Sequence, residues 1–321
     1  WTENEAGLLA TVFEAESETD EVDFVKTEIE ALRNLHKLND FVVLYRTNAQ
    51  SRILEEIFIQ NNLPYRLIGA LRFYDRKEVK DILAYLKLIL NEHDKVSLRR
   101  IINVPPRGIG KKSQETISND QTNPKIQKFQ TMMEELRENA NLYSSSEARS
   151  NKANSSRSAR TISLTELIEE ILIVTGYKDF ILDGTEEGEM RWENIEELKS
   201  VATKYNTLEE FLENVALVSA IDNYDKNADA VTFMTLHNAK GLEFPVVFIV
   251  GMEEGLFPHS NCLFEPSELE EERRLCYVGM TRAEKRLYLT YARCRMLYGA
   301  IQANPSSRFI SEIPEELMER I

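Results

Sequence analysis

Residues 235–259 read TLHNAKGLEFPVVFIVGMEEGLFPH, and residues 270–292 read EEERRLCYVGMTRAEKRLYLTYA. Within them, Val246–Val250 and Leu287–Tyr291 are apolar throughout, as expected for strands buried on both faces of a sheet. Each stretch combines such a strand with a polar, glycine-containing loop and with a strand or helix that returns to the sheet. This order is typical of the nucleotide-driven motor domains built on parallel sheets.

The phosphate-binding loop of such a motor is missing from this sequence. No G-x-x-x-x-G-K-[ST] motif, whose backbone N–H groups and lysine cradle nucleotide phosphates, occurs between Trp1 and Ile321. The sequence therefore predicts one half of a motor. Because the chain begins at Trp1 rather than at a methionine, we expect it to be a piece of a longer protein.

The N-terminal residues predict alternating strands and helices. The expected elements are strands at Val12–Ala15, Phe41–Tyr45 and Tyr65–Ile68, and helices at Asp20–Lys37 and Ala49–Asn61. Thr19 or Asp20 is expected to cap the first helix. This β-α-β-α-β order indicates a parallel sheet covered by helices.

Helical spacing dominates the middle of the chain. The expected helices are Val79–Leu90, Lys125–Asn139, Thr165–Thr175, Arg191–Asn206 and Leu208–Ser219. Strand-like runs return at Val231–Leu236 and continue to the C-terminal stretches quoted above. We therefore predict an α/β domain, discontinuous in sequence and made of residues 1–72 and 227–321, with a mainly α-helical domain, residues 73–226, inserted into it.

Composition sets broad limits. The chain is 42% apolar and 29% charged, the profile of a soluble globular protein, and 321 residues suffice for two cores. The longest apolar run, around Pro245–Val250, is too short to span a bilayer, and the N-terminus has no signal peptide. We expect a cytoplasmic protein with no membrane partner. The net charge of −15 argues only weakly against nucleic acid, since a groove can be locally basic.

Two further features are assigned ordinary roles. Cys262, Cys276 and Cys294 share no C-x-x-C spacing, which favours buried thiols in a reducing compartment over disulfides or a metal site. The Ser-rich segment Asn141–Arg160 predicts a mobile, solvated linker, with a basic contact arm as the alternative.

Three polar clusters adjoin the predicted elements. Arg46-Thr47-Asn48 follows one strand, His237–Glu243 follows another, and Val278–Arg282 follows the helix predicted at Glu268–Tyr277. Because ligands in open α/β sheets bind outside the carboxyl ends of strands, we expect an arginine, a histidine and a carboxylate to meet on one rim.

In these residues the chain resembles the C-terminal half of the UvrD/PcrA/Rep group of superfamily 1 DNA helicases. YRTNAQSR (Tyr45–Arg52) resembles motif IVa, TLHNAKGLEF motif V and YVGMTRAE motif VI. FYDRKEVKDILAYL (Phe73–Leu86), NVPPRGIG (Asn103–Gly110) and RWENIEEL (Arg191–Leu198) are similar to further signatures of the family. The resemblance is colinear over essentially the whole chain. It implies a second RecA-like motor domain, called 2A, with domain 2B inserted.

The resemblance assigns nucleotide-binding roles to three residues. Arg282 matches the arginine that contacts the γ-phosphate of ATP, and Glu243, after Gly241, matches the carboxylate that accepts from the ribose. An arginine in this role stabilises the charge of the phosphoryl-transfer transition state. The alternatives are that Arg282 merely pairs with Glu271 or Glu284, and that Glu243 is a surface residue after a turn.

Other residues match DNA contacts of the family. Arg46, Asn48 and His237 correspond to contacts with single-stranded DNA, and Tyr298 to an aromatic residue that lines a base pocket. The alternatives are a structural histidine at a strand end and a core tyrosine. Arg107, Gly108, Ile109, Gly110 and Lys111 resemble an element that grips duplex DNA, where backbone N–H groups at a helix start approach a phosphate; an ordinary turn is the alternative.

The resemblance thus implies part of an ATP-dependent 3′-to-5′ DNA helicase. The full protein would bind ATP and Mg²⁺ between domains 1A and 2A, act at a junction of single- and double-stranded DNA, and meet accessory repair or replication proteins. This chain alone is expected not to hydrolyse ATP, and no metal site is expected in it. A non-catalytic nucleic-acid-binding or regulatory module and a subunit of a helicase–nuclease remain alternatives.

Overall fold

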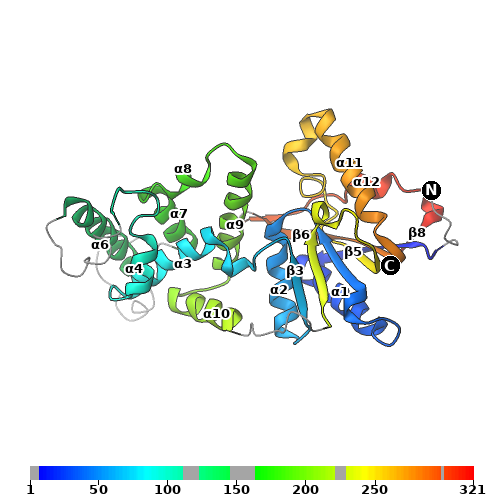
Figure 1. The fold of residues 1–321 in the computed structure, drawn as a ribbon, viewed down its shortest axis with the longest axis horizontal. Coiled ribbons are helices and arrows are strands. Elements are labelled where there is room, and N and C mark those ends of the chain that lie inside the picture. The colour runs from blue at the N-terminus through cyan, green and yellow to red at the C-terminus, as the bar shows by residue number, and fades with distance from the viewer. Residues whose placement is uncertain (1–6, 111–122, 145–162, 221–228, 298–299) are drawn as a thin grey trace, which may run out of the picture. The chain divides into compact units, whose positions relative to one another are not determined.

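The computed structural model describes residues 7–110, 123–144, 163–220, 229–297 and 300–321. These residues form two compact units (Figure 1). The sheet unit comprises Trp1–Phe73 and Ile221–Ile321, and the helical unit comprises Tyr74–Ala220. The predicted α/β class with a mostly parallel sheet is confirmed.

In the described residues one sheet contains eight strands. Their bounds are β1 Ala10–Ser17, β2 Phe41–Tyr45, β3 Tyr65–Ile68, β4 Val231–Thr235, β5 Phe244–Ile249, β6 Ala283–Leu297, β7 Ala300–Gln302 and β8 Met318–Arg320. Seven of them run in the order β3-β4-β2-β5-β6-β1-β8 and pair in parallel, whereas β7 pairs antiparallel with β6. The central strands are apolar because helices cover both faces.

Alternate side chains of each strand face opposite layers of helices. Val42 and Leu44 of β2 belong to the core that includes Cys276 of α11 (Pro266–Met280) and Phe309 of α12 (Arg308–Ser311). On the other face, α1 (Glu18–Leu32) and α2 (Ser51–Gln60) cover aromatic residues of the strands. The ring of Phe58 in α2, for example, lies 4.7 Å from that of Phe233 in β4. In Figure 1 these two layers lie above and below the strands.

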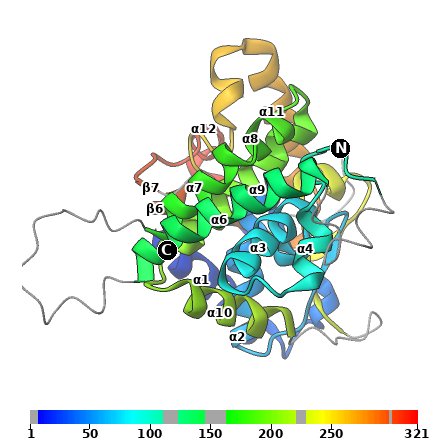
Figure 2. The same ribbon diagram turned by 90° about the vertical axis from the view of Figure 1, so that its left-hand side faces the viewer.

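The helical unit is built around α3, which packs against α4, α6, α7, α9 and α10 (Figure 2). The helix bounds are α3 Lys77–Leu90, α4 Lys95–Ile101, α6 Pro124–Ser144, α7 Leu164–Val174, α8 Tyr177–Ile181, α9 Glu186–Ala202 and α10 Leu208–Ala220. A buried polar chain joins α9 to the start of α3: Arg76 donates to the Asn194 side-chain oxygen at 2.6 Å, and the Asn194 amide donates to Glu78 at 2.6 Å. Among the described helices, none combines the length and apolar character needed to span a membrane.

Several element boundaries differ from the prediction. Helix α1 is capped by Ser17, whose hydroxyl accepts from the Asp20 N–H, and not by Thr19 or Asp20. Strand β6 extends well beyond the predicted Leu287–Tyr291. The Ser-rich segment Asn141–Arg160 lies outside the described residues from Ser145 onward.

Candidate functional site

The residues assigned to ATP meet at the amino ends of β5 and β6. Gly241–Glu243 lead into β5, and Arg282 immediately precedes β6. The Phe244 N–H donates to the Arg282 carbonyl at 2.9 Å, and Nη1 of Arg282 donates to the Leu242 carbonyl at 2.9 Å. The guanidinium therefore lies directly against the loop that carries Gly241 and Glu243.

The guanidinium of Arg282 is anchored by uncharged groups. Its Nε donates to the Val278 carbonyl at 2.9 Å and its Nη2 donates to the Thr281 hydroxyl at 3.0 Å. With the bond to the Leu242 carbonyl, three of the five N–H groups of an arginine are used. In the described part of the chain Arg282 forms no ion pair, so it pairs with neither Glu271 nor Glu284; Glu271 pairs with Arg274 instead.

Glu243 and Gly241 present an open surface beside this arginine. Both residues are exposed. Within the described residues the Glu243 carboxylate accepts no hydrogen bond and forms no ion pair, so it is available to an incoming hydroxyl. Gly241 adopts a φ of +83°, a left-handed conformation that favours glycine, while the space around it is open. The glycine therefore serves the turn of the loop.

Arg46, Asn48 and His237 lie at the opposite edge of the sheet. Arg46 and Asn48 follow the carboxyl end of β2, and His237 follows that of β4. The two strands are neighbours, with Tyr45 level with Thr235, so the three residues lie on adjacent strand ends. His237 is exposed. The structure thus groups the described residues assigned to single-stranded DNA.

The expectation that all three polar clusters share one rim is wrong for Glu243 and Arg282. The chain after β4 crosses the sheet before β5 begins, and it carries Glu243 from the carboxyl edge, where His237 lies, to the amino edge. Helix α11 likewise returns the chain to the amino edge, where Arg282 precedes β6. The edges are separated by about 16 Å, the length of a five-residue strand.

Arg46 is held by a carboxylate that sequence analysis did not find. Its Nε donates to both carboxylate oxygens of Glu272, at 2.9 and 3.0 Å. Glu272 belongs to α11 and is only 4% exposed, and it also accepts from the His259 N–H at 3.1 Å. The Arg46 N–H donates to Gln50 Oε1 at 2.9 Å. Both backbone and side chain of Arg46 are therefore fixed.

Asn48 carries an unused acceptor. Its Oδ1 atom is buried and accepts no hydrogen bond from any described residue. An unpaired buried oxygen is costly, and such atoms tend to be paired when a ligand or water is bound. This observation fits a residue that accepts from a ligand at the carboxyl edge.

In the helical unit, Arg107 organises the loop Asn103–Gly110. Its Nη1 donates to the carbonyls of Ile101 and Val104, at 2.9 and 3.0 Å, and its Nη2 donates to the hydroxyl of Tyr85 at 2.8 Å. The guanidinium also lies 5.2 Å from the centre of the Phe129 ring. Burial raises the pKa of the Tyr85 hydroxyl, so it keeps its proton and donates to the Val104 carbonyl while its oxygen accepts from Arg107. Arg107 therefore has a structural role in this loop.

Two of the backbone N–H groups that were expected to approach a phosphate in this loop already have an acceptor within the protein. The N–H groups of Arg107 and Ile109 both donate to Asn103 Oδ1, at 2.7 and 3.2 Å. The Ile109 side chain is 2% exposed and anchors the loop. Gly108 has a φ of +68°, and Gly110 is surrounded by open space. Only the N–H groups of the two glycines donate to no described acceptor, and the Lys125 side chain lies against Gly108. The N–H groups of Arg107 and Ile109 are therefore not open to a phosphate in this conformation, and the assignment of the loop to duplex DNA remains a prediction.

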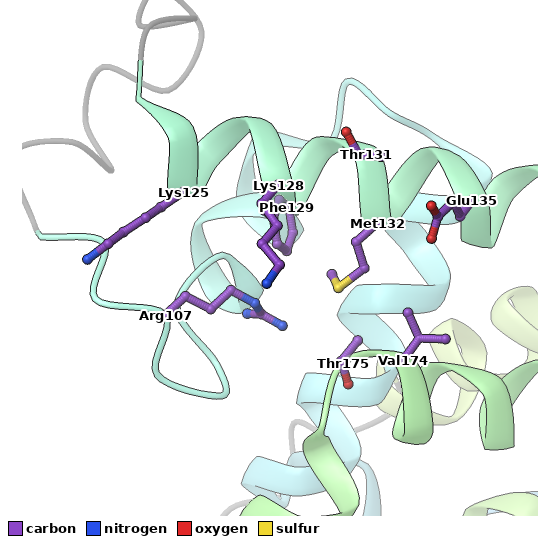
Figure 3. A pocket seen from close by; sticks show the side chains of 9 residues that line it. All are labelled: Arg107, Lys125, Lys128, Phe129, Thr131, Met132, Glu135, Val174 and Thr175. Carbon is purple, nitrogen blue, oxygen red and sulfur yellow. The ribbon is translucent and has the colours of Figure 1, made fainter.

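A pocket of about 740 Å³ lies beside this loop (Figure 3). It is lined by Arg107, Lys125, Lys128, Phe129, Thr131, Met132, Glu135, Val174 and Thr175. Lys125 extends away from the other side chains in Figure 3, and its Nζ donates to the Gly108 carbonyl at 3.0 Å. The surroundings of the loop are therefore basic, with an apolar wall formed by Met132 and Val174.

Two assigned residues and the three cysteines remain. Lys111 and Tyr298 lie outside the described residues. Cys276 is buried, which raises the pKa of its thiol to about 12. Cys262 is only half-buried and Cys294 is exposed, so the prediction of buried thiols is met by Cys276 alone among the three and is wrong for Cys294. Among the described residues, no group of three or more His, Cys, Asp or Glu side chains is arranged to hold a metal ion.

Comparison with known proteins identifies the family of the chain. The family model for the UvrD-like helicase C-terminal domain matches residues 1–294. The chain belongs to this family. It is 44% identical to the ATP-dependent DNA helicase PcrA of Bacillus subtilis (strain 168), with 100% of this chain and 46% of the relative covered. The PcrA helicases of Staphylococcus aureus (strain Mu50) and Staphylococcus epidermidis (strain RP62A) are 44% and 43% identical, with 99% of this chain and 46% of each relative covered.

The chain spans about half the length of these curated relatives and corresponds to their C-terminal part. Two charged residues that the structure buries, Glu272 and Arg295, were missed by sequence reasoning. Glu272 lies in the quoted stretch EEERRL, where one acidic residue among several gave no signal. Arg295 follows the apolar run of the strand, and a charged residue there gave no sign of burial. The alternation of charged and uncharged residues in Arg293-Cys294-Arg295 is nevertheless the two-residue period of a β-strand.

Proposed function

We propose that this chain supplies domains 2A and 2B of an ATP-dependent 3′-to-5′ DNA helicase of the UvrD/PcrA type. The sheet unit is assigned to 2A and the helical unit to 2B. One observation carries the proposal: Arg282, matched to the γ-phosphate arginine, donates to the loop that carries Gly241 and Glu243, matched to the nucleotide contacts. These residues are about 40 positions apart in sequence and meet at one edge of the sheet.

The residues at this edge fit the polar groups of ATP. Nη1 and Nη2 of Arg282 each keep one N–H beyond the bonds to Leu242 and Thr281, so a forked pair of donors remains for phosphate oxygens. The open Glu243 carboxylate would accept from a ribose hydroxyl. Arg282, already anchored by carbonyl groups, would stabilise developing phosphoryl charge without first breaking an ion pair.

The rest of the ATP site belongs to the N-terminal half of the proposed protein. That half, domains 1A and 1B, would supply the phosphate-binding loop and the carboxylate that holds Mg²⁺. Because this sequence has no G-x-x-x-x-G-K-[ST] motif, we propose that the chain alone does not hydrolyse ATP. The proposal places the protein in the cytoplasm, with accessory repair or replication proteins as further partners.

The carboxyl edge is assigned to single-stranded DNA. Exposed His237 and the partly exposed Arg46 offer donors to the phosphates of a strand, and Asn48 is the third residue assigned to this edge. In the helical unit, Gly108 and Gly110 with neighbouring Lys125 and Lys128 are assigned to duplex DNA, since open backbone N–H groups and lysines suit phosphates. A junction of single- and double-stranded DNA would engage both sites.

Binding of forked DNA by this chain tests the DNA assignments. We expect His237→Ala to weaken binding of both single-stranded and forked DNA, and Gly108→Asp to weaken binding of the fork alone, because the new carboxylate repels duplex phosphates. Fluorescence anisotropy across salt concentrations measures both. Each loss is expected to be on the order of tenfold, the cost of about one charged or backbone contact.

Two control variants match these changes. His93 is an exposed histidine in the helical unit, outside the loop Asn103–Gly110, and Gly184 is an exposed glycine of the same unit with a φ of +82°. His93→Ala and Gly184→Asp are expected to leave binding unchanged. If Gly184→Asp weakens fork binding as much as Gly108→Asp does, or if both test variants bind normally, the DNA assignments are wrong.

A further inference from the structure

Glu272 is a buried carboxylate in the middle of an exposed acidic and basic run. Its neighbours Glu271 and Arg274 are more than 70% exposed and pair with each other, whereas Glu272 is turned into the sheet unit and is 4% exposed. Its partners are the Arg46 guanidinium and the His259 N–H. A buried carboxylate with these two donors is satisfied by them, and removing either would be costly.

The ion pair uses only one side of the Arg46 guanidinium. Both bonds come from Nε, and within the described residues Nη1 and Nη2 donate to no acceptor. The side chain is 20% exposed, so these terminal nitrogens are reachable from solvent. Arginine has five donors in a planar fork, and a carboxylate at Nε leaves the four N–H groups of the terminal nitrogens for a second anion.

We propose that Glu272 is a positioning residue for single-stranded DNA binding. It fixes the guanidinium of Arg46 at the carboxyl edge so that Nη1 and Nη2 are directed to a phosphate oxygen of the strand. The inference rests on the proposed DNA-binding function of this edge. An arginine side chain without a partner would lose conformational entropy when it bound a phosphate. Because Glu272 already holds the Arg46 side chain in one conformation, this entropic cost does not arise on binding.

The direction in which DNA affinity changes when the Glu272 carboxylate is removed distinguishes a positioning role from simple electrostatics. A carboxylate near a DNA phosphate repels it, so deletion of Glu272 would tighten binding if charge alone mattered. If Glu272 instead sequestered Arg46 from DNA, its deletion would also tighten binding. Positioning predicts the opposite: the variant without the carboxylate binds more weakly although the chain is less acidic.

The test is a double-mutant cycle on this chain, read by anisotropy of a labelled oligothymidylate at several salt concentrations. Arg46→Ala and Glu272→Ala are each expected to weaken binding about five- to tenfold, as for one lost charged hydrogen bond. Each is also expected to lower the slope of log K against log salt by about 0.7, the value for one phosphate contact on a single strand. The double variant is expected to bind no worse than Arg46→Ala.

Two further variants protect this test from a folding defect. Glu272→Gln keeps an acceptor for Nε in the same shape and is expected to restore most of the affinity lost in Glu272→Ala. Glu271→Ala removes the same charge from an exposed position one residue away and is expected to bind as the wild type or slightly more tightly. Circular dichroism and thermal unfolding of each variant confirm that it is folded.

The outcomes distinguish the inference from the function on which it rests. If the wild-type chain binds no single-stranded DNA, the DNA-binding proposal fails and this inference fails with it. If Arg46→Ala weakens binding but folded Glu272→Ala binds normally or more tightly, only the positioning role is overturned. If Arg46→Ala has no effect, Arg46 is not a phosphate contact and Glu272 positions nothing for DNA.

Discussion

Arg295 is a deeply buried cation of the sheet unit. Its guanidinium bonds to both oxygens of Glu253 and, at 2.5 Å, to Glu21, and all three side chains are at most 5% exposed. Glu21 also accepts from the Gly251 N–H at 2.8 Å and from the Thr290 hydroxyl at 2.6 Å. The two carboxylates raise the pKa of Arg295 further, against the effect of burial. This network ties α1 and β6 to the loop after β5.

Replacement of Arg295 by methionine should strongly destabilise the sheet unit. The variant would leave two buried carboxylates without a counter-charge, a change that costs about 3–5 kcal/mol. Urea unfolding followed by circular dichroism measures the loss. Arg293→Met is the matched control, because Arg293 lies two residues earlier on β6, is 55% exposed and pairs with Glu14 and Glu16 at the surface. Equal stability of the two variants would contradict this account of the network.

At the residue scale, sequence alone suggested roles for particular side chains but did not show which residues hold those side chains in place. Arg46 and Glu272 are 226 positions apart, and only the folded sheet brings α11 against the end of β2. The sequence also could not show that the backbone N–H groups of Arg107 and Ile109 donate to Asn103, because these hydrogen bonds depend on the path of a single loop. The roles given to the site residues remain predictions.

Among the elements, α11 connects the two edges of the sheet. Glu272 near its middle contacts Arg46 at the carboxyl edge, and its last turn leads to Arg282 at the amino edge. The helix packs closely through Gly279: a Cβ atom there would lie 2.4 Å from Leu236 Cδ2 and 3.2 Å from Ile249 Cδ1. Leu236 and Ile249 are fully buried, so they have little room to move aside.

We expect Gly279→Val to destabilise the sheet unit by about 1–3 kcal/mol, the usual cost of overpacking a core, although valine favours a helix more than glycine does. Urea unfolding checks this value. Glu271→Val places the same side chain at an exposed position of α11 and should have little effect. The account of α11 packing is wrong if Gly279→Val is as stable as the wild type.

Strand β6 is longer than the sequence predicted, and β8 was not predicted at all. Its apolar run ends at Tyr291, but the strand continues because its backbone pairs with β1 as far as Cys294 and with β7 from Arg295 onward. Arg293 and Arg295 also pair with carboxylates of neighbouring segments. Strand β8, with Met318 as its single buried residue, is too short to give a pattern. By contrast β2 and β3 match their predicted ranges, since their apolar runs are bounded by turn residues.

At the scale of the whole molecule, the chain forms two compact units, and it passes from one to the other after Phe73 and again after Ala220. Sequence reasoning gave the fold class and the family because the signatures are colinear with it. It placed all three polar clusters at the carboxyl ends of strands, whereas Glu243 and Arg282 precede strands and therefore lie at the amino edge. The net charge of −15 did not exclude a protein of a DNA helicase family.

The central claim is that Arg282 completes an ATP site whose other half lies in the N-terminal part of the full-length protein. DNA-stimulated ATP hydrolysis by that protein, wild type against Arg282→Ala, tests it most directly. We predict that kcat falls by about 10³-fold or more in a variant that still folds and binds DNA, as for loss of an arginine that stabilises phosphoryl transfer. Full activity of Arg282→Ala, or ATP hydrolysis by the isolated chain, would contradict the claim.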